Sequence, residues 1–310
     1  MNVVFHHTAG TDLAARLAAV PKLEIRICPE DDDDLLRRML PECDVLWHVL
    51  KRCTADMMAA APKLKLIQKI GVGVNTIDLD AAKARGIPVC NLPGTNARAV
   101  AELTLALMLA ALRRLTRFDI ALRAGTWTNP ELQDGIGEIG GRTVGLVGYG
   151  AIPRILAPIL HAMGCEIVFT ARRPIADAVG LQVPLDVLLA TADIVSLHLP
   201  LTDETTSMID AAALGRMKPG AVLINTARGG LVDQDALVTA LRAGQLGGAG
   251  LDVFDMEPIA ADSPLLALPN VVVTPHVGWL TTGTFDRSFE LAAENCRRVA
   301  AGEPLLHRVV

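Results

Sequence analysis

The sequence predicts an α/β protein made of two doubly wound parallel-sheet domains. The chain has 310 residues, about twice the roughly 150 residues of a typical domain. Short runs rich in Val, Ile and Leu alternate with segments of helical spacing. The runs are nearly continuous in hydrophobicity, as expected for strands that are buried on both faces of a parallel sheet. They fall into two series, so we expect two sheets.

The first series of expected strands comprises Val3–Phe5, Leu23–Ile27, Val45–Val49, Leu66–Ile70 and Pro88–Leu92. The second series comprises Thr143–Val147, Glu166–Phe169, Ile194–Leu199, Ala221–Asn225, Ala249–Val253 and Val271–Thr274. Helical spacing marks Thr11–Val20, Asp31–Leu40, Asn96–Leu115 and Phe285–Ala301. If the last helix packs on the first sheet, the first domain is discontinuous. We therefore expect one domain from residues 1–95 and 285–310 and another from residues 96–284. The carboxyl ends of their strands should border a ligand cleft between the two domains.

Two polar segments have plain structural interpretations. The acidic run Glu30–Asp34 should cap and solvate the start of a helix, where the helix dipole favours negative charge. The segment Gly125–Gly141 is rich in Gly and polar residues, so we expect a connecting loop.

The composition argues against several classes of partner. The net charge of −5 and the ten aromatic residues do not favour nucleic-acid binding. No apolar run is long enough for a membrane span, and the N-terminus does not resemble a secretory signal. The six cysteines are scattered without a CxxC pair. We expect buried, reduced thiols in a cytoplasmic protein, with no metal site.

A glycine-rich turn indicates a dinucleotide site. The strand Thr143–Val147 runs directly into Gly148-Tyr149-Gly150-Ala151-Ile152-Pro153, and a helical segment follows. Gly148 permits the tight turn, and Gly150 lets the backbone approach a pyrophosphate at the positive end of the helix. Pro153 replaces the third glycine of the fingerprint and is tolerated in a first helical turn. Pro158 lies deeper, so we expect a kink or an irregularity there.

The end of the next strand indicates which dinucleotide is bound. An Asp or Glu at that place would bind the ribose 2′-OH and repel a 2′-phosphate. The chain instead has Thr170-Ala171-Arg172-Arg173-Pro174. Two guanidinium groups suit a phosphate. We therefore expect a preference for NADP(H), with NAD(H) as the alternative cofactor.

Polar residues follow three strands of the second series, where α/β folds place their chemistry. Arg228 follows Ala221–Ala227, Glu257 follows Ala249–Val253, and His276 follows Val271–Thr274. An arginine clamps a carboxylate with two hydrogen bonds. A histidine exchanges protons near neutral pH, and an adjacent carboxylate fixes its tautomer. These residues predict a site for proton exchange with a carboxylate-bearing ligand.

Over nearly its whole length, the sequence resembles the D-isomer-specific 2-hydroxyacid dehydrogenase family, including its glyoxylate/hydroxypyruvate reductases and phosphoglycerate dehydrogenases. The motifs that carry the resemblance are GVGVN with Ile77-Asp78, NLPG with Val100-Ala101-Glu102, GYGAI, HLPLT, NTARGG, GLDVF with Glu257-Pro258, and TPH-x-G. The family implies a flavodoxin-like substrate domain and a Rossmann cofactor domain.

The resemblance implies a role for each matching residue. His276 is the acid/base for the C2 oxygen of the substrate, Glu257 hydrogen-bonds its far side, and Arg228 binds the carboxylate. The backbone amides of Val72 and Gly73 hold the other end of that carboxylate. The expected cofactor contacts are Thr95, Gly148, Tyr149, Gly150, Ala151, Ile152, Arg172, Arg173, His198, Pro200, Thr205, Thr226, Ala227, Asp252, His276 and Gly278.

Other residues have structural interpretations. Four further histidines are expected to be packing or surface residues: His6, His7, His48 and His161. Trp279 either lines the substrate pocket or fills the core. The resemblance also implies a homodimer through the cofactor domain, with its contact at Phe118–Gly141.

The leading hypothesis is an NADP(H)-linked reductase of a small 2-keto acid such as glyoxylate or hydroxypyruvate, interconverted with the 2-hydroxy acid. An alternative with the same fold is a dehydrogenase of phosphite or another small anion. Formate is disfavoured, because the formate enzymes of the family carry Gln where this chain has Glu257. A third hypothesis is a dinucleotide-sensing binding module, which the net charge of −5 and the lack of extra interaction segments do not favour.

Overall fold

The structure is a computed structural model that describes residues 1–127 and 129–310. The expected loop at Gly125–Gly141 and the expected dimer contact at Phe118–Gly141 both include Thr128, which lies outside the described residues. The chain divides into two compact units: unit 1 contains Met1–Asn96 and Leu280–Val310, and unit 2 contains Ala97–Trp279.

Unit 1 is built on a five-stranded parallel sheet of order β2-β1-β3-β4-β5. This is the flavodoxin-like order, with a topological switch point between β1 and β3. The strands are β1 (Asn2–His6), β2 (Glu24–Cys28), β3 (Val45–His48), β4 (Leu66–Lys69) and β5 (Val89–Cys90). The helices are α1 (Thr11–Ala18), α2 (Asp33–Met39), η1 (Leu40–Glu42), α3 (Ala55–Ala59), α4 (Leu79–Ala84) and α12 (Thr282–Ala301).

The acidic run before α2 divides into two parts. The Asp32 carboxylate accepts a hydrogen bond of 2.8 Å from the Leu35 N–H and caps the helix, and Asp33 and Asp34 lie in its first turn. The capping prediction is therefore confirmed for these residues. It is wrong for Glu30, whose carboxylate pairs with His7 at 3.1 Å and accepts the backbone N–H groups of Leu50 and Lys51.

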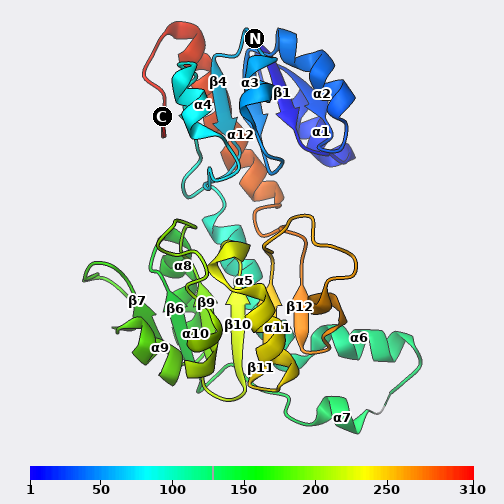
Figure 1. Cartoon of the computed structure of the whole chain (residues 1–310), viewed down its shortest axis with the longest axis vertical. Helices are drawn as coiled ribbons and strands as arrows, with labels where there is room; N and C mark the ends of the chain where they lie inside the picture. Colours follow the sequence, from blue (N-terminus) through cyan, green and yellow to red (C-terminus); the bar gives the residue numbers. More distant parts are fainter. Residues whose placement is uncertain (128) are drawn as a thin grey trace. The chain divides into compact units, whose positions relative to one another are not determined.

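Helix α12 completes unit 1 although it is last in the sequence. It lies beside β4 (Figure 1), and the Phe289 ring stacks on Trp47 of β3 with 5.5 Å between centroids. Phe289 also meets Phe5 of β1 edge to face. The buried Asn295 amide donates to Gln68 Oε1 of β4 at 2.7 Å. Apolar and polar contacts thus fix the same helix on strands that lie more than 200 residues earlier in the chain.

Unit 2 contains a seven-stranded parallel sheet of order β12-β11-β10-β9-β6-β7-β8. Its switch point lies between β6 and β9, as in a Rossmann fold. The strands are β6 (Thr143–Val147), β7 (Glu166–Thr170), β8 (Leu181–Gln182), β9 (Ile194–Leu197), β10 (Ala221–Asn225), β11 (Leu246–Leu251) and β12 (Val271–Val273). The prediction of two parallel α/β sheets is confirmed. The two-residue edge strand β8 was not predicted.

Helices cover both faces of the unit 2 sheet, each over its own apolar core. One core includes residues of α5 and α8, and the other includes residues of α9, α10 and α11. The helices are α5 (Ala97–Arg113), α6 (Leu115–Arg123), α7 (Pro130–Gln133), α8 (Ala151–Ala162), α9 (Leu185–Thr191), α10 (Ala211–Arg216), η2 (Gly229–Leu231), α11 (Gln234–Arg242) and η3 (Pro264–Ala267). Helix α8 continues through Pro158 to Ala162, so a bend at Pro158 stays a prediction.

All six cysteines are free and buried, and burial raises the pKa of Cys43 and Cys53 to about 12. Such thiols are poor nucleophiles at neutral pH. In the described residues, no helix is both long and apolar enough to span a membrane.

Candidate active site

The glycine turn after β6 has the geometry that a dinucleotide requires. Gly148 has φ +97°, and a Cβ there would lie 2.7 Å from the His198 carbonyl oxygen, so only glycine fits. Gly150 is the N-cap of α8 and faces open space, since a Cβ on it would have no atom within 4 Å. Among the residues that the structure describes, no side chain caps the first N–H groups of α8. Free N–H groups at an open helix start suit a pyrophosphate.

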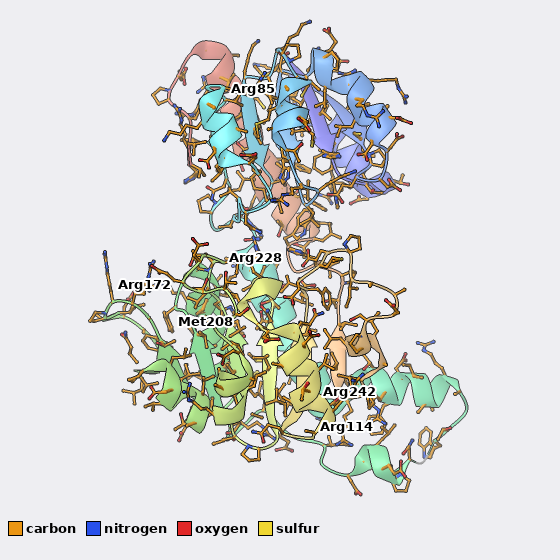
Figure 2. All side chains as sticks on the ribbon, in the orientation of Figure 1. Arg85, Arg114, Arg172, Met208, Arg228 and Arg242 are labelled. Carbon is orange, nitrogen blue, oxygen red and sulfur yellow. The ribbon has the colours of Figure 1, made fainter. Side chains whose placement is uncertain are left out.

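Two arginines follow β7 where a dinucleotide's adenosine ribose is expected. Arg172 and Arg173 are exposed, and neither forms an ion pair within residues 1–127 and 129–310. Figure 2 labels Arg172 on the loop that follows β7. No carboxylate occurs between Phe169 and Ala176. This segment therefore carries two positive charges and no negative charge before Asp177.

The structure brings His276 and Glu257 into direct contact. The imidazole Nδ1 lies 2.6 Å from Glu257 Oε2, and Glu257 Oε1 accepts the Phe254 N–H at 3.0 Å. Burial opposes ionisation of Glu257, but the hydrogen bond and charge of His276 prevail and lower the pKa of that carboxyl. In the described part of the chain, Nε2 of His276 has no hydrogen-bond partner. This pair can hold one tautomer and present the other nitrogen to a ligand.

Arg228 belongs to the same electrostatic cluster. Burial lowers the pKa of its guanidinium, and the charge of Glu257 opposes that shift. Its turn is held by Asn225, whose Nδ2 donates to the Arg228 carbonyl at 2.8 Å and whose Oδ1 accepts the Ala227 N–H at 3.0 Å. The three predicted reactive residues thus come from the ends of three strands of one sheet. Sequence reasoning missed Asn225, although its place at the end of β10 was the available signal.

Asp252 organises the turn that carries His276. Its Oδ1 accepts from Thr274 Oγ1 at 2.6 Å and from the Val277 N–H at 2.9 Å, and its Oδ2 accepts the Gly278 N–H at 2.8 Å. Burial raises the pKa of Asp252 despite these bonds. His276 has φ +53°, a conformation that is uncommon for residues other than glycine. A cofactor contact of Asp252 stays a prediction, since its three hydrogen bonds all go to this turn.

The other predicted residues of unit 2 have local partners. Trp279 is 7% exposed and donates Nε1 to the His276 carbonyl at 3.1 Å. His198 shares a hydrogen bond of 2.9 Å with Ser196, and burial lowers its pKa to about 3. Thr205 Oγ1 donates to the Pro200 carbonyl, and Thr226 shares a hydrogen bond with Thr104. The pocket role of Trp279 and these cofactor contacts stay predictions.

Three predicted residues belong to unit 1. Val72 and Gly73 follow β4, and Val72 is 42% exposed. Its carbonyl accepts from Asn91 Nδ2 at 2.8 Å. Thr95 is buried and donates its hydroxyl to the Leu92 carbonyl at 3.1 Å. Their roles toward substrate and cofactor stay predictions. Among the residues that the structure describes, no group of three His, Cys, Asp or Glu side chains could hold a metal ion.

Comparisons with known proteins identify the family. The family model described as "D-isomer specific 2-hydroxyacid dehydrogenase, NAD binding domain" matches residues 105–278. The chain is 38% identical to the hydroxypyruvate reductase of Thermotoga maritima over 278 residues, which is 88% of this chain and 90% of that protein. The chain belongs to the D-isomer-specific 2-hydroxyacid dehydrogenase family.

Two further comparisons place the chain within this family. It is 43% identical to the D-3-phosphoglycerate dehydrogenase of Mycobacterium leprae over 289 residues, 91% of this chain but 54% of that protein. The chain thus spans about half the length of the phosphoglycerate dehydrogenases that it matches. A crystal structure of a Thermus thermophilus protein superposes with a TM-score of 0.89 at 40% identity and covers 100% of both chains. The family resemblance stated from the motifs is confirmed.

Proposed function

We propose that the protein is an NADP(H)-preferring reductase of a small 2-keto acid, such as glyoxylate or hydroxypyruvate, that runs reversibly to the D-2-hydroxy acid. The observation that carries this proposal is the His276–Glu257 pair at 2.6 Å, with Arg228 in the same electrostatic cluster. Membership in a family of 2-hydroxyacid dehydrogenases supports it.

The chemistry assigns one task to each of the three residues. The nicotinamide, when bound, supplies the hydride to the C2 carbon. Arg228 binds and orients the substrate carboxylate through its planar fork of donors and stabilises the charge that develops on the C2 oxygen. His276 donates the proton that this oxygen needs. Glu257 favours the imidazolium form and fixes the ring through Nδ1. The reverse reaction uses the neutral imidazole as the base.

We assign the backbone amides of Val72 and Gly73 to the end of the substrate carboxylate that Arg228 does not hold. We assign Trp279 to the wall of the substrate pocket. The similarity to a hydroxypyruvate reductase over 90% of that relative's length supports a small 2-keto acid as the substrate. The test is NADPH oxidation with a panel of 2-keto acids. Turnover of glyoxylate or hydroxypyruvate is expected, and no turnover with any of them would contradict the proposal.

Variants of the acid/base residue test the mechanism. His276→Ala should lower kcat by about 10² to 10⁴, the usual contribution of a positioned acid/base, while NADPH still binds. His161→Ala is the matched control, because His161 is exposed on α8. Arg228→Ala should raise KM and lower kcat together. Retained turnover in the His276 variant would refute the assigned role.

The same assays separate the alternatives. Phosphite with NADP⁺ tests the small-anion dehydrogenase. Tight dinucleotide binding without turnover of any acid would support the sensing module instead.

Cofactor choice rests on Arg172 and Arg173, which stand exposed where NAD-selective folds place an acid. Arg172→Ala and Arg173→Ala should weaken NADPH binding and leave NADH binding nearly unchanged. Arg242→Ala, an exposed arginine on α11 (Figure 2), is the control for a general loss of charge. More efficient use of NADH than NADPH by the wild type would contradict this assignment.

We further propose a homodimer through the cofactor domain. Helix α6 and the segment after it expose large apolar side chains: Leu115 at 54%, Ile120 at 67%, Leu122 at 55% and Trp127 at 86%. Such a group is typical of a protein interface. Light scattering should give a mass of twice the 32.9 kDa of one chain. Ile120→Glu should lower this mass. Leu266→Glu should not, because Leu266 is also exposed, at 43%, but lies in η3, outside the proposed interface. A monomeric wild type would contradict the proposal.

The six buried thiols fit the predicted cytoplasmic location.

A further inference from the structure

The two arginines assigned to cofactor choice stand on a loop that is fastened to the rest of unit 2. We call residues Ala171–Gly180, between β7 and β8, the arginine loop. Its backbone has no helix or strand, and Arg172 and Arg173 are exposed on it. Ordering an irregular loop costs conformational entropy. The position of the two guanidinium groups therefore depends on what holds the loop.

Tyr149 holds the far end of the arginine loop. Its hydroxyl accepts the Val179 N–H at 2.7 Å and donates to the Val179 carbonyl at 3.2 Å. The ring is 7% exposed and packs against Phe169 of β7, with 4.3 Å between centroids. Tyr149 is the middle residue of the Gly148–Gly150 turn. A single side chain therefore joins the pyrophosphate turn to the arginine loop.

Gln182 holds the near end of the arginine loop. Its Nε2 donates to the carbonyls of Ala171 and Arg173, at 3.0 and 3.2 Å. These carbonyls flank Arg172 on both sides. Gly180 has φ +110° and lies directly against β7. A Cβ on this residue would be 2.5 Å from the Ile167 carbonyl oxygen, so the close approach requires glycine. The loop thus has a fixed path at both ends.

The only carboxylate of the arginine loop is Asp177, and it is paired. Arg154, in α8, donates to Asp177 at 2.8 Å, and its guanidinium carbon lies 5.9 Å from the centre of the Tyr149 ring. This pairing compensates the one negative charge that would oppose a phosphate near the loop. It also adds a second link, beside that of Tyr149, between the start of α8 and the arginine loop.

From these contacts we infer that Tyr149 is a positioning residue for selectivity toward the 2′-phosphate. Its hydroxyl keeps the arginine loop in a fixed relation to the turn that receives the pyrophosphate, so that one ligand can meet both. The inference rests on the proposed NADP(H) preference. NAD(H) lacks the 2′-phosphate, so its binding does not use the loop's guanidinium groups and is insensitive to this tether.

The test measures dissociation constants of NADP⁺ and NAD⁺ by calorimetry for the wild type and Tyr149→Phe. The variant keeps the ring and loses both hydrogen bonds. Because the loop loses two hydrogen bonds and only part of that loss reaches the ligand, NADP⁺ should bind about 5- to 10-fold more weakly. NAD⁺ binding should stay within about twofold. Thr239→Val removes one exposed hydroxyl on α11 and is the matched control.

Hydrogen exchange supplies a second readout without any ligand. The Val179 amide and its neighbours in residues 171–180 should exchange faster in Tyr149→Phe than in the wild type. Gln182→Met removes the other anchor and should shift the NADP⁺ to NAD⁺ affinity ratio in the same direction. It keeps the inference testable if the tyrosine variant does not fold.

The outcomes distinguish this inference from the proposed function. A wild type that prefers NAD⁺ overturns the proposed cofactor and this inference with it. A wild type that prefers NADP⁺, combined with an unchanged affinity ratio in both variants, overturns this inference alone. Equal weakening of both dinucleotides would assign Tyr149 to folding of the glycine turn and would also overturn it.

Discussion

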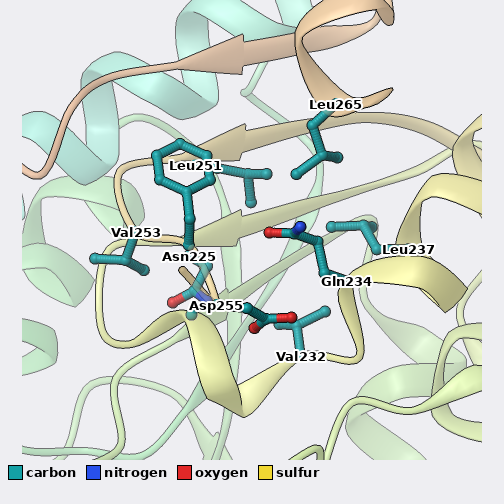
Figure 3. A pocket seen from close by; sticks show the side chains of 10 residues that line it. Asn225, Val232, Gln234, Leu237, Leu251, Val253, Asp255 and Leu265 are labelled. Atoms are coloured by element: carbon teal, nitrogen blue, oxygen red, sulfur yellow. The ribbon is translucent and has the colours of Figure 1, made fainter. Parts of the chain in front are cut away.

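Gly229→Ala tests how closely the Arg228 turn packs against the segment that leads to Glu257. A Cβ on Gly229 would lie 2.0 Å from the carbonyl carbon and oxygen of Phe254 and 2.5 Å from the Asp255 nitrogen. Ordinary contact begins at 3.4 Å, so the two backbones must separate by about 1.4 Å, the difference between 3.4 and 2.0 Å. The obstacle is main chain, which cannot rotate away as a flexible side chain does. Figure 3 shows the small pocket beside this turn, lined by Asn225 and Asp255 among others.

This separation would move Arg228 relative to Glu257 and its partner His276. A misplacement of about 1 Å in an active site lowers the rate by about 10²-fold, so kcat/KM for the 2-keto acid should fall by about that factor. Overpacking costs about 1 to 3 kcal/mol. For a unit of this size that corresponds to a Tm lower by roughly 2 to 12 °C.

The control for this variant is Gly230→Ala in the same turn. Its Cβ would meet Cδ2 of the Leu201 side chain at 3.1 Å, and a leucine side chain can adjust. We expect kcat/KM within about threefold of wild type, the scale of a shift below 1 kcal/mol. The assays are steady-state kinetics at saturating NADPH and calorimetric melting. Wild-type activity in Gly229→Ala, or equal damage in both variants, would refute the close-packing argument.

Three further predictions follow from single contacts. Glu257→Gln removes the carboxylate that lies 2.6 Å from His276 Nδ1 and fixes the ring, so kcat for 2-keto acid reduction should fall by about 10- to 100-fold; a wild-type kcat would contradict this role. Burial lowers the pKa of His198 to about 3, whereas the unfolded chain takes up that proton near pH 6.5, so stability falls as pH drops from 6.5 toward 3. When the pH is lowered from 7.5 to 5, the free energy of unfolding measured in urea should fall by about 2 kcal/mol less in His198→Asn than in the wild type. An equal fall in both proteins would contradict the role of His198. Asp32→Ala removes the cap of α2 and should cost about 1 kcal/mol, while Asp31→Ala should cost much less in the same urea assay.

Strands that are buried in the middle of a sheet could be predicted from the sequence. A strand whose position depends on contacts with other segments could not. The bounds of β6 and β10 match the predicted residues, because continuous burial in the middle of a parallel sheet requires an uninterrupted apolar run. Strand β8 has two residues, one of them Gln182, and lies at the sheet edge. Its position depends on the arginine loop and on Gly180, which no local pattern reveals.

The residues of the candidate site could be predicted from the sequence, but the hydrogen bonds that position them could not. His276, Glu257 and Arg228 could be named from the sequence because each follows an apolar strand and lies in a family motif. The hydrogen bonds of Asp252 to the His276 turn span 22 to 26 residues. Those of the Tyr149 hydroxyl to Val179 span 30. Such contacts depend on the tertiary arrangement of segments, so the sequence alone does not predict them.

The late position of α12 has a consequence for synthesis on the ribosome. The chain emerges from its N-terminus, so Trp47 and Phe5 are made long before Phe289, the ring that packs against both of them. The nascent first unit therefore exposes an apolar face while all of unit 2 is translated, and only unit 2 can complete its core in the order of translation. This face of the first unit can be covered only after α12 (Thr282–Ala301) has left the ribosome.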